Sequence, residues 1–504
     1  MAATTVRGNG EWTGKAFWCV LWAALGVYLL SRTARMNADP DLWGYLAFGR
    51  LFWEGGFPYK DVFAFTPVKD VWVYHEWLLG VLYYKAVAYF GLEFLQWLKY
   101  AALLATLAPL VLVAVRRGGR QATAYCVILY VMPVFSMNAS PVRAKVFSHL
   151  FFAVAVLVLE LCRRKRFAYA LWLLPLFAFW ANLHGEVAVG FLALGAYGVG
   201  ALVNGERSLA ARYALVLLGC FAASCITPYG PGVWKFFLYA WGHPRPDILE
   251  WQNIFHFGRD NPGFGVFFAM LALIVVAAAL LGKGRREAVS LLMLFGFLFA
   301  AAKSVRMLTY LCLAIILYVP AYLDAYAQRL AARLAPFRRV LLPCLALTAL
   351  VYGVWQGAAL WRRGIARIVV ADVAAYDPNA GFMYYPVDGL RHILATKRGG
   401  RIMPQFAWGE YLLWELPPSF TVGMDGRYET VYDDAYSDAY FAFVNGKSDA
   451  GAFLDKYGAD IVVLKKSEKA WENMRLLPDW EETFGNEGYS VFYRKASVET
   501  VPRL

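Results

Sequence analysis

The sequence predicts an α-helical polytopic membrane protein of about 11–13 transmembrane helices, followed by an α/β domain outside the bilayer. Apolar residues make up 60% of the 504 residues, whereas charged residues make up only 17%. A soluble domain cannot bury that much apolar surface, so lipid must cover part of it. Apolar runs follow one another with short polar gaps as far as Trp361, where the composition changes.

The apolar runs are candidate membrane-spanning helices. Several are shorter than the about 20 residues that a perpendicular helix needs, so their ends are approximate. We read the first run as a retained span, because no small-x-small cleavage site follows it. The candidate spans are 16–34, 76–90, 92–115, 122–139, 145–162, 167–183, 185–203, 209–226, 263–282, 287–302, 304–323 and 340–360.

Lys and Arg gather in gaps between these runs, which the positive-inside rule assigns to the cytoplasmic face. The clusters lie at 116–120, 163–166, 207–212, 283–286 and 329–339. They explain the formal charge of +13 without a nucleic-acid partner. A multi-pass protein of the cell inner (plasma) membrane is expected, with 37–75, 140–145, 183–186, 227–262, 303–306 and everything after 361 outside.

This orientation requires 76–115 to cross the membrane an odd number of times. Because that stretch holds two apolar runs, we expect one of them to be tilted, re-entrant or interfacial. The expected domains are a transmembrane domain, 1–361, with outer loops 37–75 and 227–262, and an extracytoplasmic α/β domain, 362–504. In the latter, β-type runs at 401–406, 420–424, 460–464 and 489–493 and a helical pattern at 449–457 stand out.

The first outer loop carries two carboxylates directly after the first span. Asp39 and Asp41 are followed by Tyr45 and, at the end of the loop, by His75 and Glu76. A carboxylate at a membrane surface can deprotonate an acceptor hydroxyl or hold a divalent ion near a phosphate. It can also cap the following helix, which stabilises that helix by about 1 kcal/mol. Asp41, and then Asp39, are the candidate catalytic residues, and both interpretations can hold for one residue.

Four cations fall in gaps that the topology places outside, against the positive-inside trend. They are Arg143, Lys145, Lys303 and Arg306. Cations on this side indicate an anionic partner, and a phosphate is a suitable one. Lipid headgroups or the outer carboxylates are the alternative partners.

His184, Glu186 and Glu250 are candidates for a substrate pocket or for interfacial anchors, and Tyr45, His75 and Glu76 of the first loop are further candidates for the pocket. Their spacing does not match a zinc site. In the C-terminal domain, Trp408-Gly409-Glu410-Tyr411 and Met424-Asp425-Gly426-Arg427-Tyr428-Glu429 are conspicuous. The Asp-Gly pair favours a tight turn that Arg427 can bridge to a neighbouring carboxylate, and a role in gripping an acceptor is the alternative. The Cys residues lie in or beside apolar runs, which is typical of inert thiols.

The pattern Asp41…Tyr45…Gly55-Gly56…Pro58, directly after the first span, resembles the first outer loop of GT-C glycosyltransferases. The branch it is most similar to contains protein O-mannosyltransferases and aminoarabinose transferases. The segments at 180–185, 227–230 and 250–251 resemble uncharacterised bacterial members of that group. The likeness covers 37–310 loosely, and the chain has Leu42 where the family usually has the second residue of an Asp-Glu pair.

The resemblance implies an inverting transfer of a sugar from a polyprenyl-phosphate donor to a glycan, lipid or protein acceptor at the outer membrane face. It assigns the role of base to Asp41, while basic groups hold the leaving phosphate. No cofactor is required by this reading, although a divalent cation, Mg²⁺ or Mn²⁺, can assist in relatives. The alternatives are an O-antigen-type polymerase or ligase, a transporter or flippase, and a scaffold without activity. Ionisable groups gathered at the outer ends of spans favour surface chemistry over transport.

Overall fold

The computed structural model describes residues 7–164, 166–243, 245, 247–281, 287–375 and 383–495. Lys165 and residues 283–286 of the basic clusters lie outside this part. The chain forms two compact units. The bundle unit comprises Met1–Ala34, Gln96–Pro231 and His243–Arg367, and the loop-and-sheet unit comprises Arg35–Leu95, Gly232–Gly242 and Ile368–Leu504.

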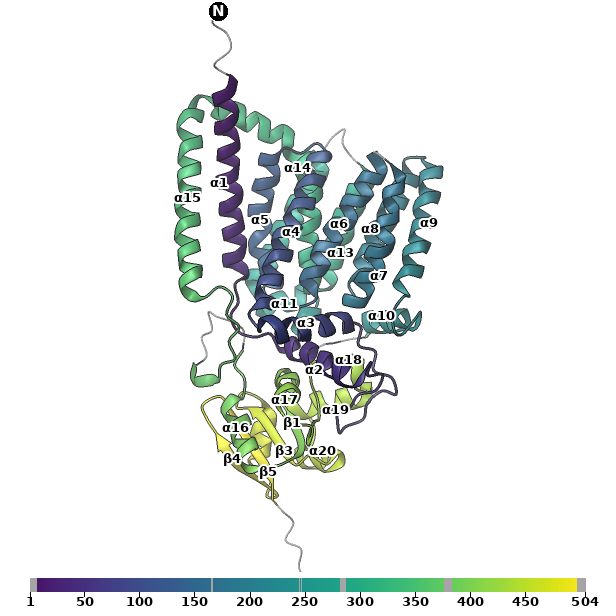
Figure 1. Cartoon of the computed structure of the whole chain (residues 1–504), viewed down its shortest axis with the longest axis vertical. Helices are drawn as coiled ribbons and strands as arrows, with labels where there is room; N and C mark the ends of the chain where they lie inside the picture. The colour runs from purple at the N-terminus through teal and green to yellow at the C-terminus, as the bar shows by residue number, and fades with distance from the viewer. Residues whose placement is uncertain are drawn as a thin grey trace, which may run out of the picture. The chain divides into compact units, whose positions relative to one another are not determined.

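Long apolar helices that run side by side form the bundle unit (Figure 1). They are α1 (Arg7–Thr33), α4 (Phe94–Arg116), α5 (Gln121–Ala139), α6 (Lys145–Arg164), α7 (Leu173–Leu183), α8 (Val187–Val203), α9 (Arg207–Ser224), α12 (Pro262–Leu281), α13 (Ala288–Lys303), α14 (Leu308–Leu334) and α15 (Arg338–Arg363). Shorter helical turns are η1 (Phe167–Trp172), η2 (Leu249–Trp251), α11 (Ile254–Asp260), η3 (Val305–Met307) and η4 (Ala335–Phe337).

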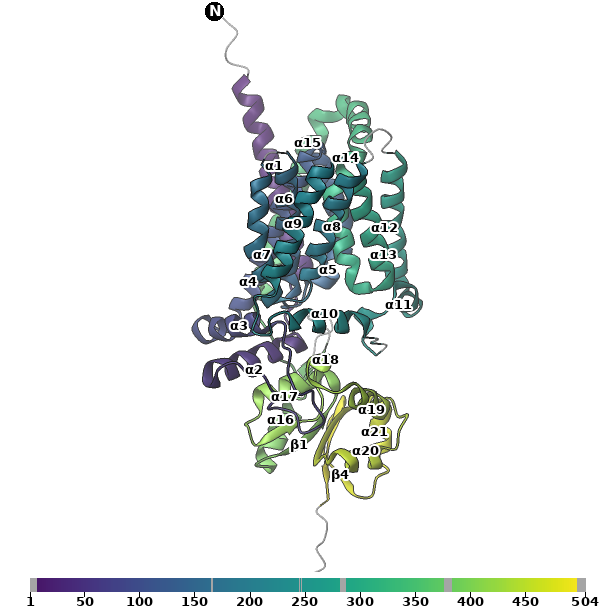
Figure 2. The ribbon, with the colours of Figure 1, turned by 90° about the vertical axis from the view of Figure 1, so that its right-hand side faces the viewer.

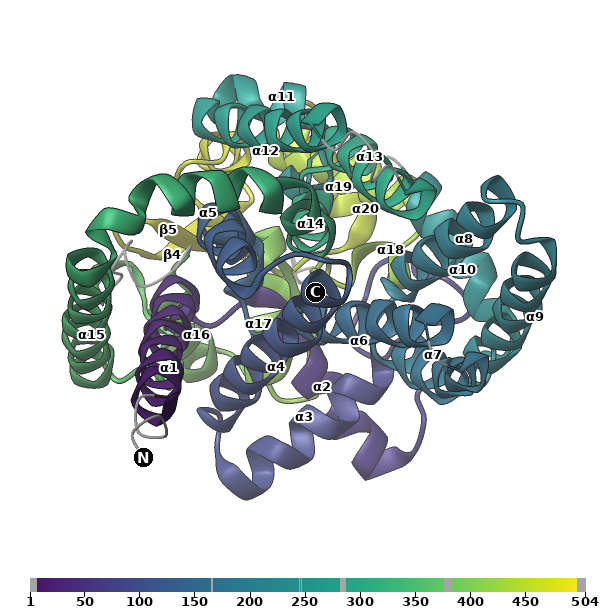
Figure 3. The same cartoon turned by 90° about the horizontal axis from the view of Figure 1, so that it is seen from above.

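Helix α14 is the centre of the bundle unit. Its residues from Leu308 to Pro320 are all buried, and α5, α12 and α13 pack against it. Figure 3 shows this helix surrounded by others, whereas α15 pairs with α1 at the edge. A helix that is apolar on all sides suits this central position, because no face of it has to meet water.

The helices confirm a polytopic membrane protein. Within the described residues, six helical segments are long and apolar enough to cross a membrane, and the last of these contains both α14 and α15. Shorter apolar helices add to this set, among them η1–α7, α8 and α13. Each expected span corresponds to a helix with ends within a few residues, except that α1 begins nine residues before 16 and α14 extends about three turns past 323.

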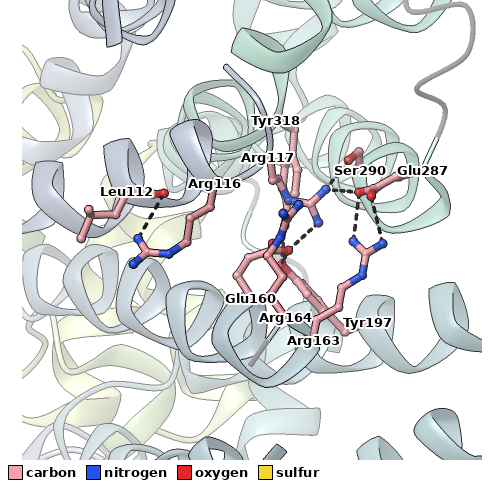
Figure 4. Close-up of polar contacts among 10 residues, drawn as sticks. All are labelled: Leu112, Arg116, Arg117, Glu160, Arg163, Arg164, Tyr197, Glu287, Ser290 and Tyr318. Carbon is pink, nitrogen blue, oxygen red and sulfur yellow. Dashed lines mark hydrogen bonds and ion pairs between the residues drawn. The ribbon is translucent and has the colours of Figure 1, made fainter. Parts of the chain in front are cut away.

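A largely buried ion network links several helices at one end of the bundle unit (Figure 4). Glu160 is fully buried and accepts hydrogen bonds at 2.6 Å from both Arg117 and Tyr197. Arg117 also pairs with Glu287, whose carboxylate binds Arg163 at 2.9 Å. The network joins α4, α6, α8 and the start of α13, so basic residues of two expected cytoplasmic clusters have specific partners.

The core of the loop-and-sheet unit is a five-stranded mixed sheet in the order β2-β1-β3-β5-β4. Strands β1 (Gly400–Pro404), β2 (Phe420–Val422) and β3 (Ile461–Lys465) are parallel, whereas β4 (Trp480–Gly485) and β5 (Tyr489–Arg494) pair antiparallel. Helices cover both faces, with α19, α20 and α21 on one and α16 and α17 toward the other (Figure 2). These helices are α16 (Val387–Thr396), α17 (Gly409–Glu415), α19 (Asp434–Val444), α20 (Ala450–Tyr457) and α21 (Lys469–Met474).

The α/β character confirms the prediction for the C-terminal region, and four of the strands fall where β-type runs were expected. The remaining helical segments of the unit are α2 (Pro40–Gly55), α3 (Trp77–Phe90), α10 (Gly232–Gly242), η5 (Val373–Ala375), η6 (Phe406–Trp408) and α18 (Tyr428–Val431). Strand β4 was not foreseen.

The first loop is part of the same compact unit as the sheet. Ala64 forms a bridge with Val422 at the edge strand β2, and Val68 forms one with Tyr432. These bridges cover an edge strand that would otherwise expose unpaired backbone groups. The two compact units therefore do not meet at a single boundary near 361. Residues 35–95 and 232–242 come before that point but group with residues 368–504.

Helices α2 and α3 pack against each other and belong to the loop-and-sheet unit. Gly49 lies so close to the backbone of Gly80 that a Cβ at position 49 would collide with the Gly80 carbonyl. The apolar run at 76–90 therefore pairs with the first-loop helix, and α4 is the helix of 76–115 that joins the bundle unit.

Candidate functional site

Arg306 is the centre of a polar cluster at one end of the bundle unit. It lies in η3, between α13 and α14, and its Nε donates to Glu186 Oε1 at 2.9 Å. Its Nη2 contacts His184 Nε2 at 3.1 Å. Tyr310 donates to the other Glu186 oxygen at 2.6 Å. The short segment between α7 and α8, which holds both His184 and Glu186, is thereby tied to the start of α14.

The tautomer of His184 follows from its partners. Burial lowers the pKa of His184 to about 3, so the imidazole is neutral near pH 7. A guanidinium can only donate, so Nε2 must be the accepting nitrogen and Nδ1 carries the proton. Nδ1 then donates to Ser148 Oγ at 2.8 Å, and Trp180 Nε1 donates to the same oxygen at 2.8 Å. These directed bonds hold Arg306 in one orientation.

Arg143 and Lys145 lie in the same cluster. Lys145 is the first residue of α6, and its ammonium donates to the Arg306 carbonyl at 3.0 Å. Arg143 Nη1 lies 3.6 Å from Glu250 Oε2, and Arg306 Nη1 lies 3.5 Å from Glu250 Oε1. We name the five residues Arg143, Lys145, Glu186, Glu250 and Arg306 the cation cluster. With both carboxylates ionised, its formal charge is +1.

Glu250 is held more loosely than Glu186. Its two ion pairs are longer than ordinary charge-assisted hydrogen bonds, and a third of its side chain is exposed. Burial opposes ionisation, but the charges of Arg306, Arg143 and Lys145 outweigh it and hold the pKa of Glu250 below its ordinary value. Glu250 is therefore an anion at neutral pH that bridges two arginines from the loop containing η2.

Lys303 and His149 lie near the cation cluster but make different contacts. Lys303, at the end of α13, has its ammonium 5.7 Å from the Phe299 ring rather than on a carboxylate of the cluster. His149 lies one helical turn after Lys145 on α6 and is fully buried between Phe135 and Tyr310, with no hydrogen-bond partner for either ring nitrogen among the described residues.

The loop-and-sheet unit holds the first-loop carboxylates. Asp39 is the N-cap of α2 and accepts from the Asp41 backbone N–H at 3.2 Å. Pro40 occupies the first helical turn, where its missing N–H costs nothing. Asp41 therefore lies in the first turn of α2, where the helix dipole favours a negative charge. The cap interpretation holds for Asp39, and Asp41 keeps its carboxylate for other contacts.

Glu410, from the Trp408–Tyr411 motif, lies beside Asp41. Glu410 Oε2 accepts a hydrogen bond from the Gly44 backbone N–H at 3.1 Å. Burial, together with the charges of Asp41 and Asp425, raises the pKa of Glu410 well above its ordinary value. Glu410 is fully surrounded by protein, so the neutral carboxylic acid is its favoured form.

The Asp425-Gly426-Arg427 turn completes this group. Arg427 Nε and Nη2 donate to the two oxygens of Asp425 at 2.8 and 2.7 Å, which is a bidentate pair. Arg427 Nη1 pairs with Asp61 of the first loop, and its guanidinium lies 4.9 Å from the Trp72 ring centre. All three charged side chains are buried. We name Asp41, Glu410, Asp425 and Arg427 the carboxyl cluster.

The remaining expected pocket residues lie in the same unit. Tyr45 is buried, with its ring against Tyr74 and Tyr83. His75 packs on Phe236 of α10, and its Nε2 lies 4.0 Å from Glu76. Tyr45 therefore belongs to an aromatic core.

The expected site residues are distributed over the two compact units. Arg143, Lys145, Glu186, Glu250 and Arg306 meet in the bundle unit, whereas Asp39 and Asp41 belong to the loop-and-sheet unit. Among the described residues, no group of three His, Cys, Asp or Glu side chains is arranged to hold a metal ion.

The sequence predicted the bridge from Arg427 to a neighbouring carboxylate, which Asp425 provides. It did not predict the contacts of Glu410, although an acid inside the apolar stretch 406–414 was a signal of a buried carboxyl. It also missed Ser148 and Tyr310, for which no local signal exists, because hydroxyl groups on apolar helices gain a role only from their neighbours.

Comparisons with known proteins define the fold. No protein-family model matches the chain, and no curated protein matches it by sequence. A crystal structure of the Archaeoglobus fulgidus oligosaccharyltransferase, tethered to an acceptor peptide containing the NVT sequon, is similar with a TM-score of 0.54 and 12% identity. That match covers 89% of this chain and 69% of the other.

A crystal structure of ArnT from Cupriavidus metallidurans, bound to undecaprenyl phosphate, is similar with a TM-score of 0.53 and 14% identity. It covers 95% of this chain and 98% of that one. These likenesses confirm the GT-C-like membrane fold that the first-loop motif predicts.

Proposed function

We propose that the protein transfers a sugar from a polyprenyl-phosphate donor to a hydroxyl of a glycan, lipid or protein acceptor at the extracytoplasmic membrane face. The observation that carries this proposal is the cation cluster, in which three cations from two separate segments meet at one end of a GT-C-like helix bundle. One similar structure is an oligosaccharyltransferase by name, and the other, ArnT from Cupriavidus, holds undecaprenyl phosphate. Basic clusters at the other helix ends favour the extracytoplasmic assignment.

The cation cluster is suited to a phosphate that gains charge. When the bond between the sugar C1 and the phosphate oxygen breaks, the electron pair stays on that oxygen, and the phosphodiester monoanion becomes a phosphomonoester with one more negative charge. Arg306 and Arg143 stabilise this charge most where it develops, in the transition state. The hydrogen bonds of Glu186 and His184 orient Arg306 in advance, so little reorganisation is needed.

Asp41 is suited to the complementary step. Its carboxylate takes the proton of the acceptor hydroxyl while that oxygen attacks C1 of the sugar. A single displacement of this kind inverts the configuration at C1. Proton, electron pair and leaving group are then all accounted for, because the base gains a proton as the phosphate gains a charge. Asp41 lies in the first turn of α2, where the helix dipole favours a negative charge.

The direct test uses the purified full-length protein with a radiolabelled polyprenyl-phosphate sugar and an extract of envelope glycans and lipids as acceptor. The expected result is release of polyprenyl phosphate together with a labelled product. Asp41→Asn should lower kcat by at least about 100-fold, since general bases contribute about 10²–10⁴-fold.

Glu54→Gln is the matched control, because Glu54 is an exposed carboxylate at the opposite end of the same helix. Its turnover should equal that of the parent protein. Transfer by Asp41→Asn at the parental rate would remove Asp41 as the base. A parent protein that binds polyprenyl-phosphate sugars but never releases polyprenyl phosphate would contradict the transferase assignment itself.

A further inference from the structure

Glu410 fills a space that two glycines leave open. A Cβ added at Gly44 on α2 would come within 2.5 Å of Glu410 Oε2, and one added at Gly426 would lie 2.9 Å from Glu410 Oε1. The same added atom at Gly426 would lie 3.7 Å from Asp41 Oδ1. The Glu410 carboxyl is therefore inserted between the first turns of α2 and the Asp425–Arg427 turn, next to Asp41.

The charges that face Glu410 are mostly negative. Asp41 approaches from α2 and Asp425 from the turn after β2, and both raise the pKa of Glu410. Arg427 is the cation that opposes them, and three of its five N–H donors are engaged by Asp425 and Asp61. Two phenols complete the surroundings, Tyr74 and Tyr385, and each interacts electrostatically with Asp41 and with Glu410.

We infer that Glu410 is a positioning residue for the base: it stays protonated, holds the start of α2 through Gly44, and leaves Asp41 as the ionised carboxylate of the pair. This inference rests on the proposed function, in which Asp41 is the base. Under this inference, a residue of the C-terminal region supports the base that the first loop provides. Two ionised carboxylates in this space would repel each other, and the base would move with the turn that carries it.

A purely structural role and a positioning role for Glu410 predict different effects of pH on turnover. If the side chain served only to fill space, glutamine in its place would leave the pH dependence of turnover unchanged. If Glu410 must stay protonated, turnover falls at alkaline pH when it ionises beside Asp41. Glutamine has the same shape, can accept from Gly44 and never ionises, so it removes that fall.

The first experiment measures kcat/KM against pH for the full-length parent protein, Glu410→Gln and Glu410→Ala. We expect an alkaline fall in the parent that is absent in Glu410→Gln, and a loss of about tenfold or more at neutral pH in Glu410→Ala but a smaller loss in Glu410→Gln. Glu415→Gln, an exposed position on the same helix α17, is the matched control and should reproduce the parental profile. The same alkaline fall in Glu410→Gln as in the parent would overturn the inference.

The second experiment does not depend on transfer. Infrared difference spectra between the parent and Glu410→Gln at pH 7 should show the carbonyl stretch of a protonated carboxylic acid in the parent, and titration to higher pH should remove it. A carboxylate signal at pH 7 in its place would overturn the inference. If no donor is turned over by the parent, the proposed function fails, and these spectra still decide whether Glu410 holds a proton.

Discussion

Arg306 Nε and Glu186 Oε1 lie 2.9 Å apart although the two residues are separated by 120 positions in the chain. The pair joins the segment between α7 and α8 to the start of α14. Glu250 lies farther from the same guanidinium, at 3.5 Å. The Arg306 guanidinium is therefore bound more tightly by Glu186 than by Glu250. Under the proposed function, an incoming phosphate would displace Glu250 more readily than Glu186.

The first prediction concerns this exchange. Glu250→Gln should tighten binding of a polyprenyl phosphate by about tenfold, because the carboxylate no longer competes with the phosphate for Arg143 and Arg306. A tenfold change corresponds to about 1.4 kcal/mol. The measurement is a binding titration with the full-length protein in detergent. Asp260→Gln, at the end of α11, is a control for removal of one negative charge from the same loop region. Weaker binding by Glu250→Gln would mean that Glu250 orients Arg143 and Arg306 for the phosphate rather than competing with it for them.

The second prediction compares the contributions of Arg143 and Lys303 to binding of polyprenyl phosphate. Arg143→Gln should weaken polyprenyl phosphate binding by the about 1.5–3 kcal/mol of a charge-assisted hydrogen bond. Lys303→Gln should weaken it less, because the Lys303 ammonium lies against Phe299 rather than on a carboxylate of the cluster. Arg143 is preferred to Arg306 as the test, since removing Arg306 leaves the buried Glu186 without its guanidinium. Equal losses in the two variants would show that only overall positive charge matters.

The helices could be predicted from the sequence because lipid imposes a strong requirement: each span must be apolar and long enough. The strands β1, β3 and β5 could be predicted because they are apolar runs. Strand β4 could not, since Trp480-Glu481-Glu482-Thr483-Phe484-Gly485 is strongly polar and becomes a strand only by pairing with β5. The pairing of α2 with α3, and the grouping of 35–95 with the sheet, likewise depend on tertiary contacts.

The candidate sites divide in the same way. Asp41 and Arg306 could be predicted because each is a charged residue in a gap next to an apolar run. Glu410 and Arg427 could not be assigned, because their importance lies in contacts with Gly44 and Asp61, more than 360 positions away. A charge that is buried by distant segments has no periodic or local signal in one sequence.

The third prediction concerns the ion network of Figure 4. Glu160→Gln should lower the free energy of unfolding by about 3 kcal/mol, because Arg117 keeps its buried charge and loses one of its carboxylates. Thermal unfolding of the detergent-solubilised protein measures this. Glu206→Gln, an exposed carboxylate before α9, should have no effect. The double variant Arg117→Met/Glu160→Leu should recover most of the loss, since it removes both buried charges; failure to recover would point to packing rather than charge as the cause.

The fourth prediction is a pH dependence of stability in the loop-and-sheet unit. Burial raises the pKa of Glu468 to about 7, and the Lys465 charge only partly opposes this. The folded state therefore binds the proton more tightly than the unfolded chain, whose Glu titrates near its ordinary value of 4.5. The stability that this proton confers is complete below pH about 4.5 and is lost as the pH rises through about 7. At about 1.4 kcal/mol per pKa unit, the loss is at most about 3.5 kcal/mol.

Glu468→Gln, which cannot ionise, tests this directly. It should be more stable than the parent at pH 8 and should lose the part of the pH dependence that lies between pH 5 and 7. Unfolding of the full-length protein at a series of pH values measures the difference between the two proteins, so titrating groups common to both cancel. Glu472→Gln on the neighbouring helix α21 is the matched control. A parental melting temperature that changes with pH in the same way as that of Glu468→Gln would show that the buried carboxyl is not the titrating group, and the stability of the sheet would then depend on other ionisations.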